Sequence, residues 1–290
     1  MNPTLPPELW LHIHALATEK SSALALSHSE CQRFAPRHQD FSKPFNLITQ
    51  FYQDVHAFTR VCRLWNALAT ALLYENVVVN EHFPALHKTL EERPNLKHAV
   101  RAVRLSPYRL DDNNAILLAC PNISVVCQAD DSEKSYGHYR AASFDLQRPQ
   151  IPQTLPSLQI LYWVETDQST GLLQPILQAA PNLKRLFISE SPQPATKRVA
   201  SDLSTVATRL EQLSLGQLVG WDMTRWILAL DFSRLTSLEC APGFIEHADF
   251  PATLPRLQML RLSCFRSRIP FARIFARFPA LRDLSLWSLG

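Results

Sequence analysis

The chain has 290 residues, of which 46% are hydrophobic and 19% are charged, and its formal net charge is +3. This balance is typical of a core-forming protein, and the small net charge argues against nucleic acid or a membrane surface as a partner. Glycine occurs only six times, and the motifs for phosphate loops, dinucleotide binding and nucleophile elbows are all missing from the sequence.

The sequence also predicts where the protein resides. Its first residues, MNPTLPPELW, lack the basic region and apolar stretch of a secretory signal, and no apolar run reaches bilayer length. The six cysteines, of which the first is Cys31, form no CxxC pair. The other five lie in apolar surroundings, and we interpret them as reduced core residues of a cytoplasmic or nuclear protein. They are Cys62, Cys120, Cys127, Cys240 and Cys264.

The N-terminal part predicts helices separated by an insertion. Residues 5–18 favour a short helix, in which Pro7 and Glu8 suit the first turn. Residues 19–46 lose the apolar periodicity and are expected to be mostly irregular.

Residues 47–75 recover helical spacing of apolar residues, with one break expected near Phe58–Arg60. Residues 76–80, NVVVN, favour a short strand that either starts the following array or caps it.

A phrase of the form Leu-x-x-Leu-x-apolar recurs through the rest of the chain, usually after a proline. Its central apolar residues are spaced by 23, 35, 25, 27, 25, 22 and 24 residues. Such a period is typical of a leucine-rich-repeat solenoid, an α/β fold in which each strand is followed by a helical segment. We therefore predict about eight repeats over residues 81–290. The central residues are Val103, Val126, Leu161, Leu186, Leu213, Leu238, Leu260 and Leu284.

The segments between these strands predict the helices of the solenoid. A polar stretch at residues 130–153 accounts for the one long spacing and is expected to be a surface loop. The predicted helices are Phe83–Glu92, Asp112–Cys120, Leu172–Ala180, Leu203–Thr208, Met223–Leu230 and Phe271–Arg277.

Residues 1–80 resemble an F-box. The resemblance depends on Leu5-Pro6-Pro7-Glu8-Leu9 with Ile13, then Val61-Cys62-Arg63-Leu64-Trp65, then Leu72-Leu73-Tyr74-Glu75. With the repeats that follow, the chain is similar to F-box/leucine-rich-repeat proteins, in style the fungal ones. Residues 19–46 interrupt the F-box pattern.

This resemblance implies a non-catalytic adaptor of a Skp–cullin–F-box ubiquitin ligase. The F-box would dock the Skp adaptor, which links it to the cullin scaffold, and the repeats would hold a protein substrate. The alternative is a repeat scaffold without a ligase link, in which these residues form a local core or cap the first repeat. The expected Skp-binding residues are Leu5, Pro6, Pro7, Leu9, Trp10, Ile13, Val61, Cys62, Trp65 and Leu68.

The substrate is expected on the strand face that points away from the helices. Side chains alternate across a strand, so the residues beside each central apolar position point outward. Aromatic residues and arginine are enriched at protein interfaces. The expected substrate-binding residues are Arg104, Tyr162, Phe187, Glu239, Arg261 and Trp287. Ser214 and Ser285 occupy equivalent positions, and Arg185 and Met259 lie one step earlier.

No metal, cofactor or catalytic centre is expected. His12, His14, His28 and Cys31 lack the spacing of a zinc finger. Asp111-Asp112 fit an N-cap and first-turn role, and Asp130-Asp131 fall in the polar loop. The chain stops at LSLWSLG, just past a repeat strand, which predicts an uncapped solenoid edge covered by further chain, a partner or another copy.

Overall fold

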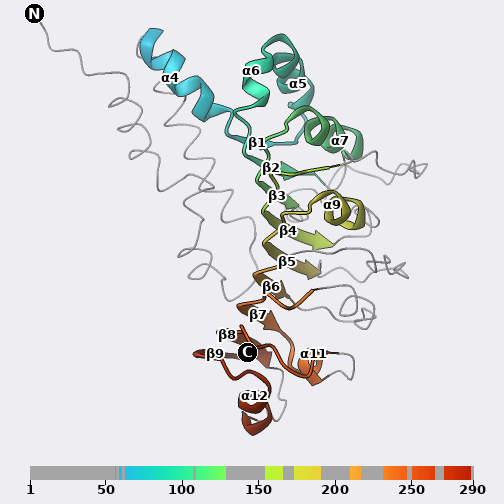
Figure 1. Ribbon diagram of the computed structural model, residues 1–290. Helices are drawn as coiled ribbons and strands as arrows, with labels where there is room; N and C mark the ends of the chain where they lie inside the picture. The colour runs from blue at the N-terminus through green and yellow to red at the C-terminus, as the bar shows by residue number, and fades with distance from the viewer. Residues whose placement is uncertain are drawn as a thin grey trace, which may run out of the picture.

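The computed structural model describes residues 56, 59–60, 63–106, 109–128, 154–165, 173–190, 210–216, 231–246, 250–264 and 271–288. Their nine strands form one parallel sheet whose spatial order follows the chain, β1 to β9 (Figure 1). The strands are β1 (Asn76–Val78), β2 (Ala102–Leu105), β3 (Val125–Gln128), β4 (Ile160–Glu165), β5 (Arg185–Glu190), β6 (Gln212–Leu215), β7 (Ser237–Cys240), β8 (Met259–Cys264) and β9 (Asp283–Ser288).

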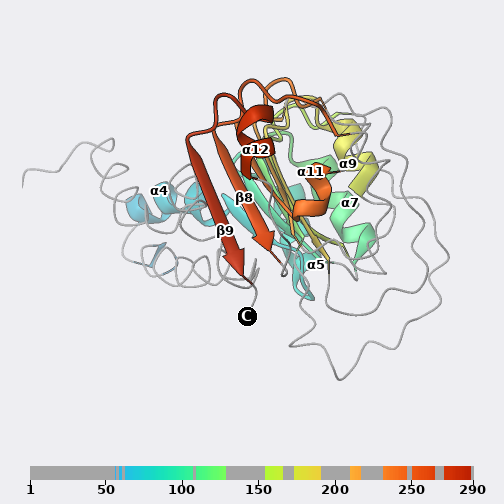
Figure 2. The same cartoon turned by 90° about the horizontal axis from the view of Figure 1, so that it is seen from below.

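Helices cover one face of this sheet. Helices α5, α7, α9, α11 and α12 lie on the same side of the strands in both views (Figures 1 and 2). The described helices are α4 (Arg63–Leu73), α5 (Phe83–Glu92), α6 (Pro94–Lys97), α7 (Leu110–Ala119), α9 (Leu173–Ala179), α11 (Pro242–Glu246) and α12 (Phe271–Arg277). The result is an α/β arrangement compatible with a solenoid.

The core lies between the sheet and these helices. The predicted central residues form one continuous row, because Val103 pairs with Val126 and each pairing repeats in register up to Leu260 with Leu284. From Val103 to Leu260 the side chains in this row are at most 2% exposed. Since no strand can bury this stripe alone, each depends on the helices and its neighbours.

A backbone ladder joins successive strands where each begins. The carbonyl of the residue before a strand accepts hydrogen bonds from two consecutive N–H groups of the next unit, as Ser124 does from Gln159 and Ile160. The pattern occurs at every junction from Glu75 to Gln258. Two asparagines reinforce it: Asn122 donates to the carbonyl of His98, and Asn182 donates to that of Pro156. Leucine-rich repeats commonly carry an asparagine just after the strand, in the pattern LxxLxLxxN, which this sequence lacks. Asn122 and Asn182 instead bond to the turns that precede the strands.

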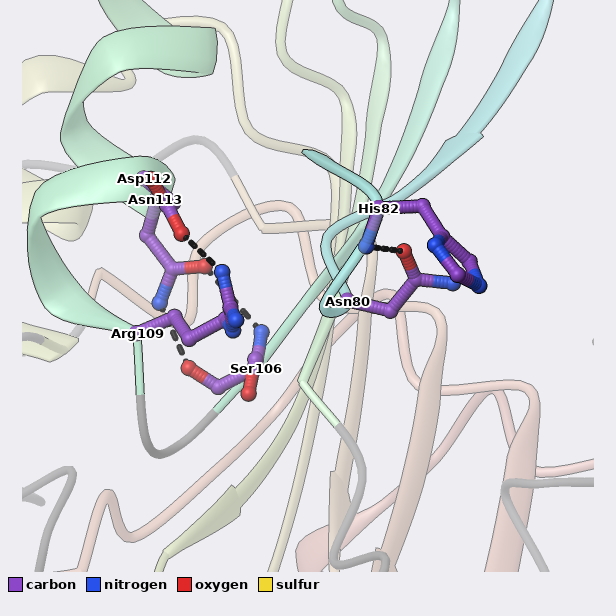
Figure 3. A network of polar contacts seen from close by, with 6 residues as sticks. All are labelled: Asn80, His82, Ser106, Arg109, Asp112 and Asn113. Atoms are coloured by element: carbon purple, nitrogen blue, oxygen red, sulfur yellow. Dashed lines mark hydrogen bonds and ion pairs between the residues drawn. The ribbon is translucent and has the colours of Figure 1, made fainter. Parts of the chain in front are cut away.

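Helix α7 is attached to the end of β2 by a buried amide (Figure 3). The Asn113 side chain accepts from the N–H of Ser106 at 3.1 Å and donates to its carbonyl at 2.7 Å. Arg109 and Asp112 form an ion pair at 2.7 Å beside it. Asp111 and Asp112 lie in the first turn of α7, as predicted, but neither is the N-cap residue, which is Arg109.

Several predicted boundaries agree with the structure. Helices α5 and α12 have the predicted limits, and Arg60 lies in a turn at the predicted break before α4. Segment 76–80 contributes β1, so the sheet begins inside the range expected for the helical domain. The short helices α6 and α11 were not predicted, because four or five residues are too few for an apolar period to appear.

Other predictions concern residues outside the described ranges. These are the 5–18 helix, the insertion at 19–46, the loop at 130–153 and the helices at 203–208 and 223–230. Of the cysteines, Cys120, Cys127 and Cys240 are buried free thiols, as expected.

Candidate binding face

The sheet has a second face, opposite the helices, which we call the open face. Pairing in register places Arg104, Cys127, Tyr162, Phe187, Ser214, Glu239, Arg261 and Ser285 in one row across it, from β2 to β9. Neighbouring strands in a sheet are about 4.8 Å apart, so consecutive members of this row are direct neighbours. The row exists only because all the pairings keep the same register.

An aromatic pair occupies the middle of the open face. The rings of Tyr162 and Phe187 stack with their centroids 4.5 Å apart and their planes 14° from parallel. Tyr162 and Ile160 also pack against Ala102 and Val125, which form a small apolar cluster separate from the main core. This face therefore carries an aromatic and aliphatic cluster over β2 to β5, in which Ala102 and Val125 are buried and Ile160, Tyr162 and Phe187 are half-buried.

A polar group lies beside this patch, on β6 to β8. Burial raises the pKa of Glu239 above its ordinary value of 4.5, while the charge of Arg261 and a hydrogen bond from Ser214 oppose that rise. These three side chains come from adjacent strands at paired positions. A carboxylate held this way is preorganised to accept a hydrogen bond or an ion pair from a partner.

Five of the six residues predicted to bind substrate meet in the row. They are Arg104, Tyr162, Phe187, Glu239 and Arg261. Trp287 belongs to β9, where its backbone pairs with Ser263, but its side chain is outside what the structure describes. Arg185 and Met259 lie in the adjacent row, which also contains Gln212 and Ser237.

Cys127 was missed as a member of the row. It directly follows the central residue Val126, so the same rule that found Tyr162 could have found it. Its side chain is only 2% exposed, which agrees with its prediction as a core residue.

The F-box-like sequence reaches the sheet through its last block. Tyr74 packs against the main core, and the carbonyl of Glu75 accepts the N–H groups of Arg101 and Ala102. Burial raises the pKa of the Glu75 carboxyl, and the charge of Arg101 opposes the rise. Only Tyr74 and Glu75 separate α4 from β1, so the helix and the sheet are closely coupled.

The structure describes the side chain of none of the residues predicted to bind the Skp adaptor. Leu5, Pro6, Pro7, Leu9, Trp10, Ile13, Val61 and Cys62 are not among the described residues. Trp65 and Leu68 belong to α4, but their side chains are not described. The structure therefore leaves the docking prediction as it stood.

Within the described ranges, no three histidine, cysteine or acidic side chains gather as metal ligands would. In the same ranges, every helix is too short or too polar to cross a lipid bilayer. His12, His14, His28, Cys31, Asp130 and Asp131 lie outside them. Comparison with models of known protein families and with curated proteins finds no match for this chain.

Proposed function

We propose that this protein is the substrate-recognition adaptor of a Skp–cullin–F-box ubiquitin ligase. In this proposal residues 1–80 form an F-box that docks the Skp adaptor, and residues 81–290 form a leucine-rich-repeat solenoid whose open face holds a protein substrate. The protein itself performs no bond chemistry, needs no cofactor and acts in the cytoplasm or nucleus.

The observation that carries the proposal is the junction between α4 and the sheet. The block Leu72-Leu73-Tyr74-Glu75 belongs to the F-box resemblance and leads directly into β1. Because the Glu75 carbonyl forms the first rung of the backbone ladder, a partner bound at α4 would keep a defined orientation to the open face. An adaptor needs such coupling to raise the effective concentration of a target lysine.

The open face supports the second half of the proposal. Its aromatic pair and the neighbouring charged group have the composition that protein interfaces favour. The half-buried side chains of Tyr162, Phe187, Glu239 and Arg261 are spread over β4, β5, β7 and β8, which suits an extended protein segment more than a small molecule.

Binding of the Skp adaptor tests the ligase link. Purified chain should retain a Skp adaptor in a pull-down, and the double variant Leu9→Ala/Trp65→Ala should lose most of it. Leu118→Ala is the matched control, because Leu118 is 56% exposed on α7 and lies outside the F-box segment. Equal retention by all three proteins, or no retention by the wild type, would rule the ligase link out.

Substrate capture tests the open face separately. Proximity labelling in the source cells should identify proteins that Phe187→Ala no longer labels, while Skp labelling stays unchanged. Arg256→Ala, an exposed residue before β8, serves as the control. If Phe187→Ala and Arg256→Ala label the same set, the substrate does not bind the aromatic pair.

The alternative is a repeat scaffold without a ligase link. The packing of Tyr74 against the main core is compatible with it, since a helical cap would make that contact too. The two functions differ in one result: the scaffold would lose its partners with Phe187→Ala but would never retain a Skp adaptor.

A further inference from the structure

Strand β9 forms an edge of the sheet. Among the strands that the structure describes, it pairs with β8 alone, and at six residues it is twice as long as β1 at the opposite edge. Long edge strands invite pairing with another chain, and proteins usually protect them with charged residues or proline. Strand β9 carries one charge, Asp283 at its start, and its other residues, Leu-Ser-Leu-Trp-Ser, include neither a charge nor a proline.

Exposed apolar side chains gather at this same end. The described residues include four large hydrophobic side chains that are clearly exposed, and three of them lie here: Phe271, Phe275 and Leu286, at 44, 55 and 48%. Phe271 and Phe275 are four residues apart, so they share one face of α12. Leu286 belongs to the core-facing row of β9, since it pairs with the buried Leu262.

The backbone of β9 shows which groups face outward. The N–H of Asp283 donates to the carbonyl of Gln258 at 2.9 Å, toward β8. In a parallel ladder the residues alternate in the direction their N–H and C=O groups face. The backbone groups of Leu284 and Leu286 therefore face away from β8, at the edge.

We propose that β9 and α12 form the interface of a homodimer, in which two copies pair their β9 strands antiparallel about a two-fold axis at Ser285. This register places Leu284 opposite Leu286 of the second copy, so the outward N–H and C=O groups of each leucine can form hydrogen bonds with those of the other. Both leucines point to the core side, and the apolar row continues from one sheet into the other. The inference does not depend on the ligase link.

The helices fit the same arrangement. Helix α12 lies at the end of the helical layer, beside the last two strands (Figure 2). Its counterpart in the second copy would lie about two strand spacings away, roughly 9–10 Å, which is within the usual distance between packed helices. Phe271 and Phe275 would then meet their equivalents instead of water.

Charge favours a second copy over a charged partner. The nearest charged residues are Arg282, just before the strand, and Asp283, its first residue. They would face Ser288 and Trp287 of the second copy, so no like charges meet. A two-fold arrangement also closes at two copies, because each edge is used once. The alternative occupants are a different protein or a further segment of chain, and the experiment separates them.

Sedimentation equilibrium of the full chain tests the proposal over a hundredfold range of concentration. We expect a species of twice 33.0 kDa that Phe275→Glu and Leu286→Lys convert to monomer. Leu118→Glu is the matched control, because Leu118 is as exposed as Phe275 but lies on α7. Circular dichroism should be unchanged in all three variants, since the replaced side chains are exposed.

A cysteine at the axis tests the register. In the proposed pairing the two Ser285 Cα atoms lie about 4.5 Å apart, as in any antiparallel pair without mutual hydrogen bonds, which a disulfide can bridge. Ser285→Cys should therefore form a covalent dimer in air, whereas the wild type and Ser237→Cys, on the interior strand β7, should not.

The outcomes that overturn the proposal are distinct. A wild-type chain that stays monomeric over the whole range leaves the edge to another occupant. A dimer that survives both Phe275→Glu and Leu286→Lys uses a different surface. A dimer in which Ser285→Cys does not cross-link lacks the proposed strand pairing.

Discussion

Arg277 is the side chain whose loss should destabilise the C-terminal units most. From the last turn of α12, its guanidinium donates to four carbonyls, one in α11 and three in the segment between α11 and β8. These are the carbonyls of Ile245, Phe250 at 3.3 Å, Pro251 at 3.0 Å and Ala252 at 3.3 Å. The guanidinium carbon also lies 5.4 Å from the centroid of the Phe250 ring.

The magnitude follows from what Arg277→Ala leaves behind. Three of the four hydrogen bonds are partly buried, and each carbonyl left without a partner costs about 1 kcal/mol. The cation–π contact adds about 0.5 kcal/mol. We expect Arg277→Ala to lower the free energy of unfolding by about 3–4 kcal/mol. Arg277→Lys should recover less than half, because one ammonium cannot span four carbonyls.

Urea denaturation followed by circular dichroism measures this loss. Arg273→Ala is the matched control: it removes the same charge one turn earlier on α12, where the side chain is exposed, and should cost less than about 0.5 kcal/mol. Hydrogen exchange of residues 242–254 should accelerate in Arg277→Ala and not in Arg273→Ala. Equal stability of the two alanine variants would refute the reasoning, as would full recovery by lysine.

Three further predictions concern buried groups. Asn113→Ala should lower the free energy of unfolding, measured in urea, by about 2–4 kcal/mol, because the N–H and the carbonyl of Ser106 both lose a hydrogen bond. The control Asn114→Ala, whose side-chain oxygen has no hydrogen-bond partner in the described part of the chain, should lower it by less than about 1 kcal/mol, and similar losses in the two variants would contradict the anchoring role of Asn113. Burial raises the pKa of Cys120 to about 11 and raises that of Cys240 further, so both thiols should resist iodoacetamide in the native state and react in urea, as mass spectrometry of the peptides would show. Because the pKa of Glu239 is raised in the folded state, its protonation favours folding most below about pH 4.5, and this contribution is lost as the pH rises through the folded pKa. In urea denaturation at several pH values, Glu239→Gln should therefore be more stable than the wild type at neutral pH and should lose less stability as the pH rises from acid. A variant less stable than the wild type at neutral pH would mean that the pairing with Arg261 outweighs burial.

The sequence determined the repeating part of the fold. Strand positions follow from the leucine spacing, because an inward apolar residue is needed wherever a strand crosses the core. Helices α5 and α12 were predicted to the residue, since each has a proline or an apolar residue at its start and a clear end. The outward residues of the open face were also found by alternation, except Cys127.

The tertiary structure decided which of these residues become neighbours. Tyr162 stacks on Phe187, and Glu239 interacts with Ser214 and Arg261, although the members of each group lie more than 20 positions apart in the sequence. The sequence alone does not predict these contacts, because only the register of the strands brings the residues together. The anchoring roles of Asn113 and Arg277 depend on carbonyls and N–H groups whose positions are set by packing. Local periodicity fixes what each unit buries; the stacking of units fixes what they present to a partner.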